Sequence, residues 1–465
     1  MFATLSNYAL LLLRLLSMVV LTRQLFLGFS AETYGFWALL WSIFAYALLL
    51  DLGLGTALQK YTSQWRAGHE RSFGALLSTA GLLYSLMGLL VALGVWLMEP
   101  SLAVFLPGLS PETLSHYQRV FHVFGMGTAA LFPLGCFVEL LRGMEALVLR
   151  NAIQALGVVA HLCLSLWALT SASDPLMAMV WVSLGVTGIV NLSLGGAFFW
   201  RVYREQRALS WGFPRWAMVR ELLQFSVFAW VITLTNLIIF RTDQLVISSS
   251  LGLAAVAGYQ IIQRVAEMYR QYTTQLHDVL GPQVAAHFQK GDHQAVRQAL
   301  LSSQRWVLTL VLWSFLPLFI GLPFLLQLWL GLSDPAVLLS GRILLCSMAL
   351  QIVMRSTSTQ VMLMCQQERT LMRLAVGEAL GNLVLSVVLA PWLGIVGVAL
   401  GTLLPNLLVT LGGYLPLTYR FLRLDMSEYV KLAFTPMPVL PWVRSAFQGL
   451  FLVCQKGRLW LPFQH

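Results

Sequence analysis

Long apolar stretches recur along the whole chain of 465 residues. Each is at least about 18 residues long, the length that a helix needs to cross about 30 Å of hydrocarbon. Hydrophobic residues make up 58% of the chain and charged residues only 10%, whereas soluble domains carry about 25% charge. Pattern and composition together predict an all-α polytopic membrane protein.

The apolar pattern predicts about twelve membrane-spanning helices. No stretch between them is long enough to fold as a separate soluble domain. The approximate bounds are 7–28, 34–58, 74–98, 117–140, 152–170, 175–200, 222–249, 254–281, 304–330, 339–364, 374–392 and 395–417.

Lysine and arginine divide the connections into two alternating classes. One class contains basic residues, such as Lys60 and Arg66 in its first member and Arg420 in its last. By the positive-inside rule these connections and the N-terminus are cytoplasmic, which requires an even number of spans. The other class contains neither lysine nor arginine and comprises 29–33, 99–116, 171–174, 250–253, 331–338 and 393–394.

The two halves show a weak internal repeat. At an offset of 223 residues Gly68 falls on Gly291, and after one added residue the sequence ALLS at 75–78 falls on ALLS at 299–302. The alternative is that loops flanked by apolar helices simply look alike. Parallel repeats of six helices would place a substrate site between them near the midplane. The predicted division is an N-terminal lobe at 1–200, a cytoplasmic connection at 201–221, a C-terminal lobe at 222–417 and a cytoplasmic or interfacial tail at 418–465.

Four charged residues of the seventh and eighth predicted helices share a depth. Counted from the turn near residue 252, Arg241 and Asp243 lie 11 and 9 residues before it, and Arg264 and Glu267 lie 12 and 15 residues after it. At about 1.5 Å per residue they lie within roughly 9 Å of one another in depth. A charge at mid-membrane costs about 3 kcal/mol and normally faces water or a partner. We therefore predict a layer of two cations and two anions.

The eighth predicted helix also carries a polar stripe. Its members recur at three- and four-residue steps, so they share one face, which we expect to line water. The planar guanidinium groups suit an anionic group such as a diphosphate. The alternative is that the charges only pair and brace the helices. The stripe includes Gln260, Gln263, Arg264, Glu267, Arg270 and Gln271.

Two further charge pairs follow from the same depth argument. Arg14 and Asp51 lie 17 and 20 residues from a turn near residue 31, and Arg355 and Glu378 lie 13 and 10 residues from a turn near residue 368. Either pair can face a cavity or can serve only to hold two helices together.

Four stretches of sequence resemble a known family. They are YGFWALLWSIFAYALLLDLGLGTALQKY at 34–61, RTDQLVISSSLGLAAVAGYQIIQRV at 241–265, VLGPQVAAHFQKGD at 279–292 and LGIVGVALGTLLPNLL at 393–408. They resemble the polysaccharide biosynthesis protein or O-antigen (Wzx-type) flippase family of the MOP flippase superfamily.

The resemblance implies a fold, a function and a location. The fold would be two six-helix lobes in a V shape, as in the MATE transporters. The function would be transfer of an undecaprenyl-diphosphate-linked oligosaccharide from the cytoplasmic to the periplasmic leaflet by alternating access, for O-antigen, capsule or exopolysaccharide synthesis. The location would be the bacterial inner membrane, with a cytoplasmic N-terminus.

The expected site combines the resemblance with the charge analysis. A coupling H⁺ or Na⁺ and membrane lipids are expected partners, and a polysaccharide polymerase is a candidate partner; no cofactor, metal or nucleic acid is expected. Substrate-binding candidates in a central cavity are Arg264, Arg270, Arg241, Arg14, Arg355, Gln263 and Gln271. Ion-coupling or charge-pair candidates are Asp243, Glu267, Asp51 and Glu378.

The tail departs from the family pattern, because relatives often have fourteen helices or a regular C-terminal pair. Pro436, Pro438 and Pro441 crowd its only apolar stretch. A helix lying in the membrane interface is therefore favoured over a thirteenth span.

Three other functions remain as alternatives. A cation-coupled multidrug exporter on the same fold would need a more acidic or apolar cavity, and a peptidoglycan-precursor flippase would share the chemistry of the leading hypothesis. A membrane glycan polymerase would need catalytic residues on a sizeable extracytoplasmic loop. The longest such loop, 99–116, offers only Glu99, Glu112 and His116. No nucleophile, metal or phosphate-loop motif occurs, so we do not expect an enzyme.

Overall fold

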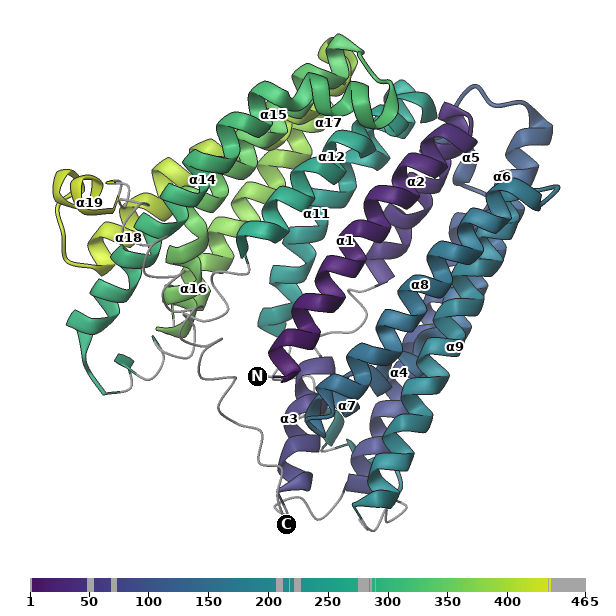
Figure 1. Cartoon of the computed structure of the whole chain (residues 1–465), viewed down its shortest axis with the longest axis horizontal. Coiled ribbons are helices and arrows are strands. Elements are labelled where there is room, and N and C mark those ends of the chain that lie inside the picture. Colours follow the sequence, from purple (N-terminus) through teal and green to yellow (C-terminus); the bar gives the residue numbers. More distant parts are fainter. Residues whose placement is uncertain are drawn as a thin grey trace, which may run out of the picture. The chain divides into compact units, whose positions relative to one another are not determined.

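The structure is a computed structural model. It describes residues 2–47, 54–67, 73–205, 212–216, 218–220, 227–274, 284, 287–288, 290–365, 367–433 and 435. Within these residues the regular secondary structure is helical and no strand occurs (Figure 1). The all-α prediction is confirmed.

The first half of the described chain is a series of helices joined by short connections. Serine caps begin two of them, because the Ser30 and Ser110 hydroxyls accept hydrogen bonds from the backbone N–H groups of Thr33 and Thr113 at 3.1 and 3.2 Å. The helices are α1 (Phe2–Gly28), α2 (Ala31–Ala45), α3 (Leu54–Arg66), α4 (Phe73–Met98), α5 (Leu102–Phe105), α6 (Pro111–Leu131), α7 (Cys136–Gly143), α8 (Leu147–Ser171) and α9 (Pro175–Arg204).

The second half contains longer helices with local irregularities. A π-helical turn at Ile352–Ser356 joins α15 to α16, and another at Thr410–Tyr414 joins α17 to α18. The helices are α11 (Val227–Leu251), α12 (Leu253–Thr274), α14 (His293–Leu330), α15 (Pro335–Gln351), α16 (Thr357–Met364), α17 (Glu368–Val409), α18 (Leu415–Phe421) and α19 (Met426–Ala433).

Eight helical segments of the described chain are long and apolar enough to cross a membrane. They are Leu5–Gly28, Phe73–Met98, Pro111–Gly143, Leu147–Ser171, Pro175–Arg204, His293–Leu330, Pro335–Thr359 and Arg369–Phe421. The chain is thus a multi-pass membrane protein.

These segments account for nine of the predicted spans, because the last one contains two. Gly394 breaks α17 with φ 60° and ψ −143°, a conformation that glycine adopts without a steric penalty. The break coincides with the predicted connection at 393–394.

The other three predicted spans correspond to α2 with α3, to α11 and to α12. Residues 48–53, 222–226 and 275–281 of these spans lie outside the described residues. The predictions for Asp51 and for the tail after Thr435 also fall outside them.

Contacts between residues group the chain into two compact units. The first unit comprises Met1–Met268, Leu322–Leu344 and Met372–Pro405, and the second comprises Tyr269–Gly321, Leu345–Leu371 and Asn406–His465. The boundaries between the two units fall within α12, α14, α15 and α17, so the grouping does not follow whole helices. The division into six-helix lobes at 1–200 and 222–417 stays a prediction.

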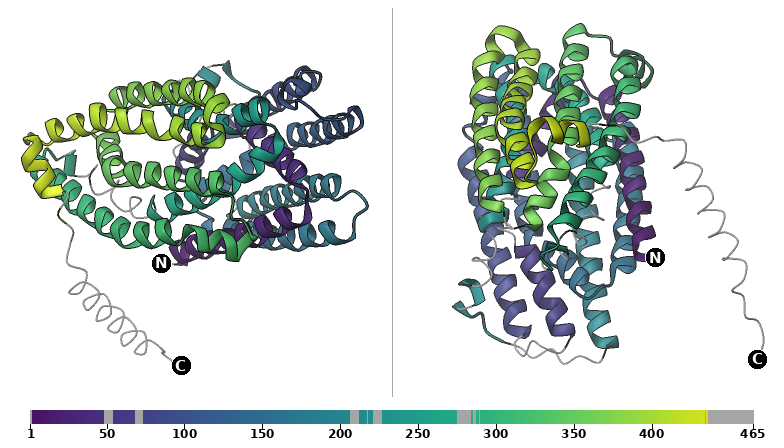
Figure 2. Two further views of the ribbon diagram at one scale, coloured as in Figure 1. Left: turned by 90° about the horizontal axis from the view of Figure 1, so that it is seen from above. Right: turned by 90° about the vertical axis from the view of Figure 1, so that its left-hand side faces the viewer.

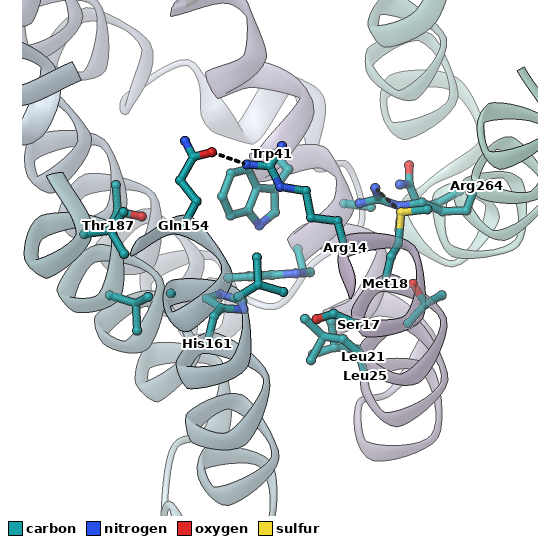
Figure 3. A pocket seen from close by; sticks show the side chains of 18 of the residues that line it. Arg14, Ser17, Met18, Leu21, Leu25, Trp41, Gln154, His161, Thr187 and Arg264 are labelled. Atoms are coloured by element: carbon teal, nitrogen blue, oxygen red, sulfur yellow. Dashed lines mark hydrogen bonds between the residues drawn. The ribbon is translucent and has the colours of Figure 1, made fainter. Parts of the chain in front are cut away.

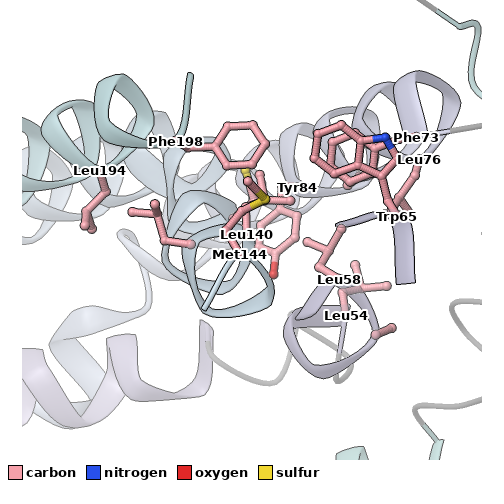
Figure 4. Close-up of a cluster of buried hydrophobic side chains, with 14 of the residues drawn as sticks. Leu54, Leu58, Trp65, Phe73, Leu76, Tyr84, Leu140, Met144, Leu194 and Phe198 are labelled. Carbon is pink, nitrogen blue, oxygen red and sulfur yellow. The ribbon is translucent and has the colours of Figure 1, made fainter. Parts of the chain in front are cut away.

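Helices α1, α8 and α9 lie side by side within the first unit, with α8 in contact with both others (Figures 1 and 2). An apolar core forms where α3, α4, α7 and α9 meet (Figure 4). In it the rings of Trp65 and Phe73 stack with centroids 4.0 Å apart, and Leu140 and Phe198 are fully buried. The second unit has its own core around Leu300, Val361 and Tyr429.

Candidate functional site

A cavity of about 480 Å³ lies in the first unit and is lined by α1, α2, α8, α9 and α12 (Figure 3). Two of the predicted substrate-binding residues, Arg14 and Arg264, line this one cavity although 250 positions separate them in sequence. Gln260 of the predicted polar stripe lines it as well.

Arg14 extends from α1 toward α8. Its Nη2 donates a hydrogen bond to Oε1 of Gln154 at 3.1 Å (Figure 3). Nearer the N-terminal ends of both helices, Nδ2 of Asn151 donates to Oδ1 of Asn7 at 2.5 Å. The two contacts fix α1 and α8 in a parallel register, so the Arg14 guanidinium group is held at the cavity wall.

Arg264 approaches the same cavity from α12. Its Nη1 lies 3.5 Å from the sulfur atom of Met18, a weak acceptor (Figure 3). Its Nε is buried and has no hydrogen-bond partner among the described residues. A buried donor without a partner costs free energy, so this guanidinium group is suited to donate hydrogen bonds to an anionic ligand.

The cavity is cationic. Among the described residues that line it, Arg14 and Arg264 carry formal charge and none is aspartate or glutamate. Two arginine side chains in a partly enclosed space favour anionic groups, and most strongly groups with several oxygens such as phosphates.

The rest of the wall combines aromatic and neutral polar side chains. Helix α2 contributes Trp37 and Trp41, whose rings meet edge to face with centroids 5.9 Å apart. From α8, His161 lines the cavity and one of its ring nitrogens lies 3.2 Å from the Ser183 hydroxyl. Thr187 and Asn191 follow from α9. Such a wall offers stacking surfaces and hydrogen-bonding groups without further charge.

A second polar centre lies around Asp243, which is only 2% exposed. The Tyr259 hydroxyl donates to its Oδ2 at 2.6 Å, the Thr402 hydroxyl donates to the same oxygen at 3.2 Å, and the Ser386 hydroxyl donates to Oδ1 at 3.4 Å. The Asn382 amide in turn donates to the Thr402 hydroxyl at 3.0 Å. These oxygens come from α11, α12 and α17 and suit a proton or a hard cation such as Na⁺.

The other predicted residues of the first unit do not line the described cavity. The side-chain amide of Gln263 donates to the carbonyl oxygen of Phe240 at 2.6 Å. Arg241 and Glu267 are partly buried, and Glu378 is 2% exposed. The charge layer predicted for helices seven and eight therefore stays a prediction, although Arg264 and Asp243 have clearly different surroundings.

Three predicted substrate-binding residues belong to the second unit, namely Arg270, Gln271 and Arg355. Arg355 lies in the π-helical turn and is 8% exposed. Its guanidinium carbon lies 4.5 Å from the centroid of the Tyr414 ring, which is a cation–π contact. The pairings of Arg14 with Asp51 and of Arg355 with Glu378 stay predictions.

Sequence reasoning did not single out several residues of the two centres. Gln154 and His161 line the cavity and are seven residues apart in the predicted span 152–170, which places them on one helical face. Gln244 and Thr402 take part in buried hydrogen bonds. A search for neutral polar residues at helical spacing would have found the first pair, but the depth argument considered mainly formal charges.

Residues 1–286 of the 465 match the model of a family described as polysaccharide biosynthesis protein. The comparison with curated proteins finds no match.

Solved membrane transporters share the fold over nearly the whole chain. An inward-facing multidrug resistance MATE family transporter of the MOP superfamily superposes with a TM-score of 0.76 at 14% identity, covering 88% of this chain and 95% of that chain. The lipid II flippase MurJ in an inward closed conformation gives 0.70 at 13% identity, covering 93% and 89%. A MOP superfamily transporter from Pyrococcus furiosus Vc1, described as having a binding pocket of reverse polarity, gives 0.61 at 12% identity, covering 91% and 94%. At these identities the likeness shows the fold, and it confirms the predicted MOP-type architecture.

Proposed function

This chain belongs to the polysaccharide biosynthesis protein family, and we propose that it is a flippase that moves an undecaprenyl-diphosphate-linked oligosaccharide from the cytoplasmic to the periplasmic leaflet by alternating access. We place it in the bacterial inner membrane with a cytoplasmic N-terminus. Its product would serve the synthesis of O-antigen, capsule or exopolysaccharide.

The observation that carries this proposal is the shared cavity of Arg14 and Arg264. A diphosphate presents several acceptor oxygens, and two planar guanidinium groups on facing helices can bind them in a bidentate manner. The neutral polar groups of α8 and α9 then serve the sugar hydroxyls, while the tryptophan rings of α2 provide faces for the sugar rings.

Asp243 is the proposed coupling residue. It is buried, accepts hydrogen bonds from three hydroxyl groups and does not line the cavity of Arg14 and Arg264. A carboxylate in this setting can take up H⁺ or Na⁺ from one side of the membrane and release it on the other without contact with the lipid-linked substrate.

Two alternatives share the fold. The MATE transporter in the comparison is described as a multidrug resistance protein, but cationic drugs would be repelled by a cavity whose described lining carries two arginines and no carboxylate. MurJ is described as a lipid II flippase, and a peptidoglycan precursor would fit the same diphosphate chemistry. A lipid II flippase and the proposed oligosaccharide flippase would therefore differ in the glycan that they carry and not in the diphosphate that they bind.

The test is reconstitution into liposomes with a fluorescent sugar linked to undecaprenyl diphosphate. We expect Arg14→Ala and Arg264→Ala to reduce its transfer to the level of protein-free liposomes, because each removes one anchor of the diphosphate. Arg297→Ala is the matched control, since Arg297 pairs with Glu428 at 3.3 Å in the second unit. Transfer by both cavity variants at the wild-type rate would remove these arginines from the mechanism.

Two further measurements separate the alternatives. Uptake of a cationic dye by the wild-type liposomes would support a multidrug exporter. Rescue of cells depleted of their essential lipid II flippase would identify a peptidoglycan precursor as the substrate.

A further inference from the structure

Helices α11 and α12 are joined by two adjacent side-chain contacts. Asp243 and Gln244 are consecutive on α11, and their partners Tyr259 and Gln260 are consecutive on α12. The first contact belongs to the Asp243 centre, and the second ends on a residue that lines the Arg14–Arg264 cavity. The two centres are therefore connected through one turn of each helix.

Gln244 is the residue on which these contacts converge. It is fully buried, and its amide nitrogen donates to the side-chain oxygens of both Gln260 and Gln263 on α12. Its own side-chain oxygen accepts a hydrogen bond from the hydroxyl of Ser42 on α2. An amide can donate and accept at once, which neither an apolar side chain nor a carboxylate can do in this position.

Helix α2 is held closely against α11 and α12 along its length. At one end the Tyr46 and Thr242 hydroxyl oxygens lie 2.5 Å apart. At the other end a Cβ on Gly35 would lie 1.9 Å from the carbonyl oxygen of Leu253, so only glycine permits this approach. The Ser42–Gln244 contact lies between the two, and α2 also supplies Trp37 and Trp41 to the cavity wall.

We propose that Gln244 is a positioning residue that transmits cation binding at Asp243 to the substrate cavity and to α2. This inference rests on the proposed function. A cation at the carboxylate competes for the oxygen that accepts from Tyr259, which shifts α11 relative to α12. Gln244, the next residue on α11, then moves relative to Gln260 and Ser42, which changes the cavity wall and the hold on α2. Buried polar networks of this kind transmit such shifts because each member depends on the others.

The proposal has a thermodynamic consequence. If the cation changes the affinity for the substrate by some factor, the substrate changes the affinity for the cation by the same factor. Loss of Gln244 should remove this mutual factor while each ligand still binds, because Asp243, Arg14 and Arg264 remain in place.

The experiment measures binding of undecaprenyl diphosphate to the purified full chain by calorimetry in detergent, with Na⁺ present or replaced by choline and at acidic and alkaline pH. For the wild type we expect the favoured cation to change the affinity by about 5- to 150-fold, the usual range of coupling between sites. In Gln244→Met, which keeps the volume and removes both the donor and the acceptor of the side-chain amide, the factor should fall to about one.

Gln304→Met is the matched control. Gln304 is also fully buried, but its amide donates to the carbonyl oxygen of Val353 within the second unit. This variant should keep the wild-type coupling. Ser42→Ala is a milder change that removes only the hydrogen bond between α2 and Gln244. It should lower the coupling factor, and it provides a second test if Gln244→Met is poorly folded.

The outcomes separate this inference from the proposed function. Wild-type coupling in both Gln244→Met and Ser42→Ala would overturn the role of Gln244 and leave the flippase proposal intact. Absence of undecaprenyl diphosphate binding to the wild type would overturn the proposed function itself. Binding that no cation alters would overturn the coupling role of Asp243 and, with it, the role of Gln244.

Discussion

At the scale of single residues, four arginines of this membrane protein differ in their surroundings. Arg14 and Arg264 line a cavity, whereas Arg150 and Arg355 are only 7% and 8% exposed and do not line it. Arg150 lies in the first turn of α8, where its Nε and Nη2 donate to Oδ1 of Asn151 at 3.1 and 2.7 Å.

The first prediction concerns the geometry of the diphosphate anchor. In Arg264→Lys the charge is kept, but the planar fork that binds two oxygens at once is lost. We expect undecaprenyl diphosphate to bind about tenfold more weakly, with a smaller loss for undecaprenyl monophosphate. Calorimetry in detergent measures both, and an unchanged preference for the diphosphate would contradict the bidentate role.

The second prediction concerns the stability of the α1–α8 contact. Asn151 accepts from the buried Arg150 and donates to Ser6 and Asn7, so Asn151→Leu leaves a buried guanidinium group without its acceptor. We expect a loss of about 3 kcal/mol in the free energy of unfolding. Thermal unfolding in detergent tests this against Asn191→Leu, whose side chain lines the cavity and should matter less. Equal melting temperatures for the two variants would argue against the network.

At the scale of helices, close approach depends on a few glycines. Gly35 brings α2 against the first residue of α12, and a Cβ on Gly401 would lie 2.6 Å from the backbone nitrogen of Ser386 within α17. In the absence of a hydrophobic driving force within lipid, such small-residue contacts are a main source of helix association. Gly35 follows Tyr34 of the cavity wall, and Gly401 precedes Thr402 of the Asp243 centre, so both close approaches adjoin a polar centre.

The third prediction tests one of these contacts. Gly35→Ala places a methyl group into the backbone of Leu253, and we expect it to destabilise the protein by about 1–3 kcal/mol. Gly81→Ala in α4 is the control, because its added Cβ would meet nothing within 4 Å beyond the neighbouring backbone of its own helix. It should be neutral or stabilising by up to about 1 kcal/mol, since alanine is the better helix former. Equal effects of the two substitutions on thermal unfolding would rule out a tight α2–α12 contact.

At the scale of the whole molecule, the basic residues predict an orientation in the membrane. By the positive-inside rule we propose that the connection after α9 is cytoplasmic and that the connection between α4 and α6 lies on the opposite side. The charges behind this prediction lie mostly in short connections, whereas the arginines of the cavity are within helices.

The fourth prediction follows from this orientation. In a variant without the five native cysteines, a cysteine at Leu109 should react with a membrane-impermeant maleimide in cells with a permeabilised outer membrane. A cysteine at Arg204 should react only after the inner membrane is opened. Labelling of Arg204→Cys in intact spheroplasts would contradict the proposed orientation.

The sequence alone determined the class of fold and the positions of the long helices, whereas the shared depth of the intramembrane charges stays a prediction. Apolar length and the fixed rise of an α-helix carry this information, so the break at Gly394 and the turn at Gly252 were placed by counting. What each side chain faces depends on the rotation and packing of helices distant in sequence. Only the tertiary structure therefore brought Arg14 and Arg264 to one cavity, turned Asp243 toward the hydroxyls of α17 and placed Gln244 between them.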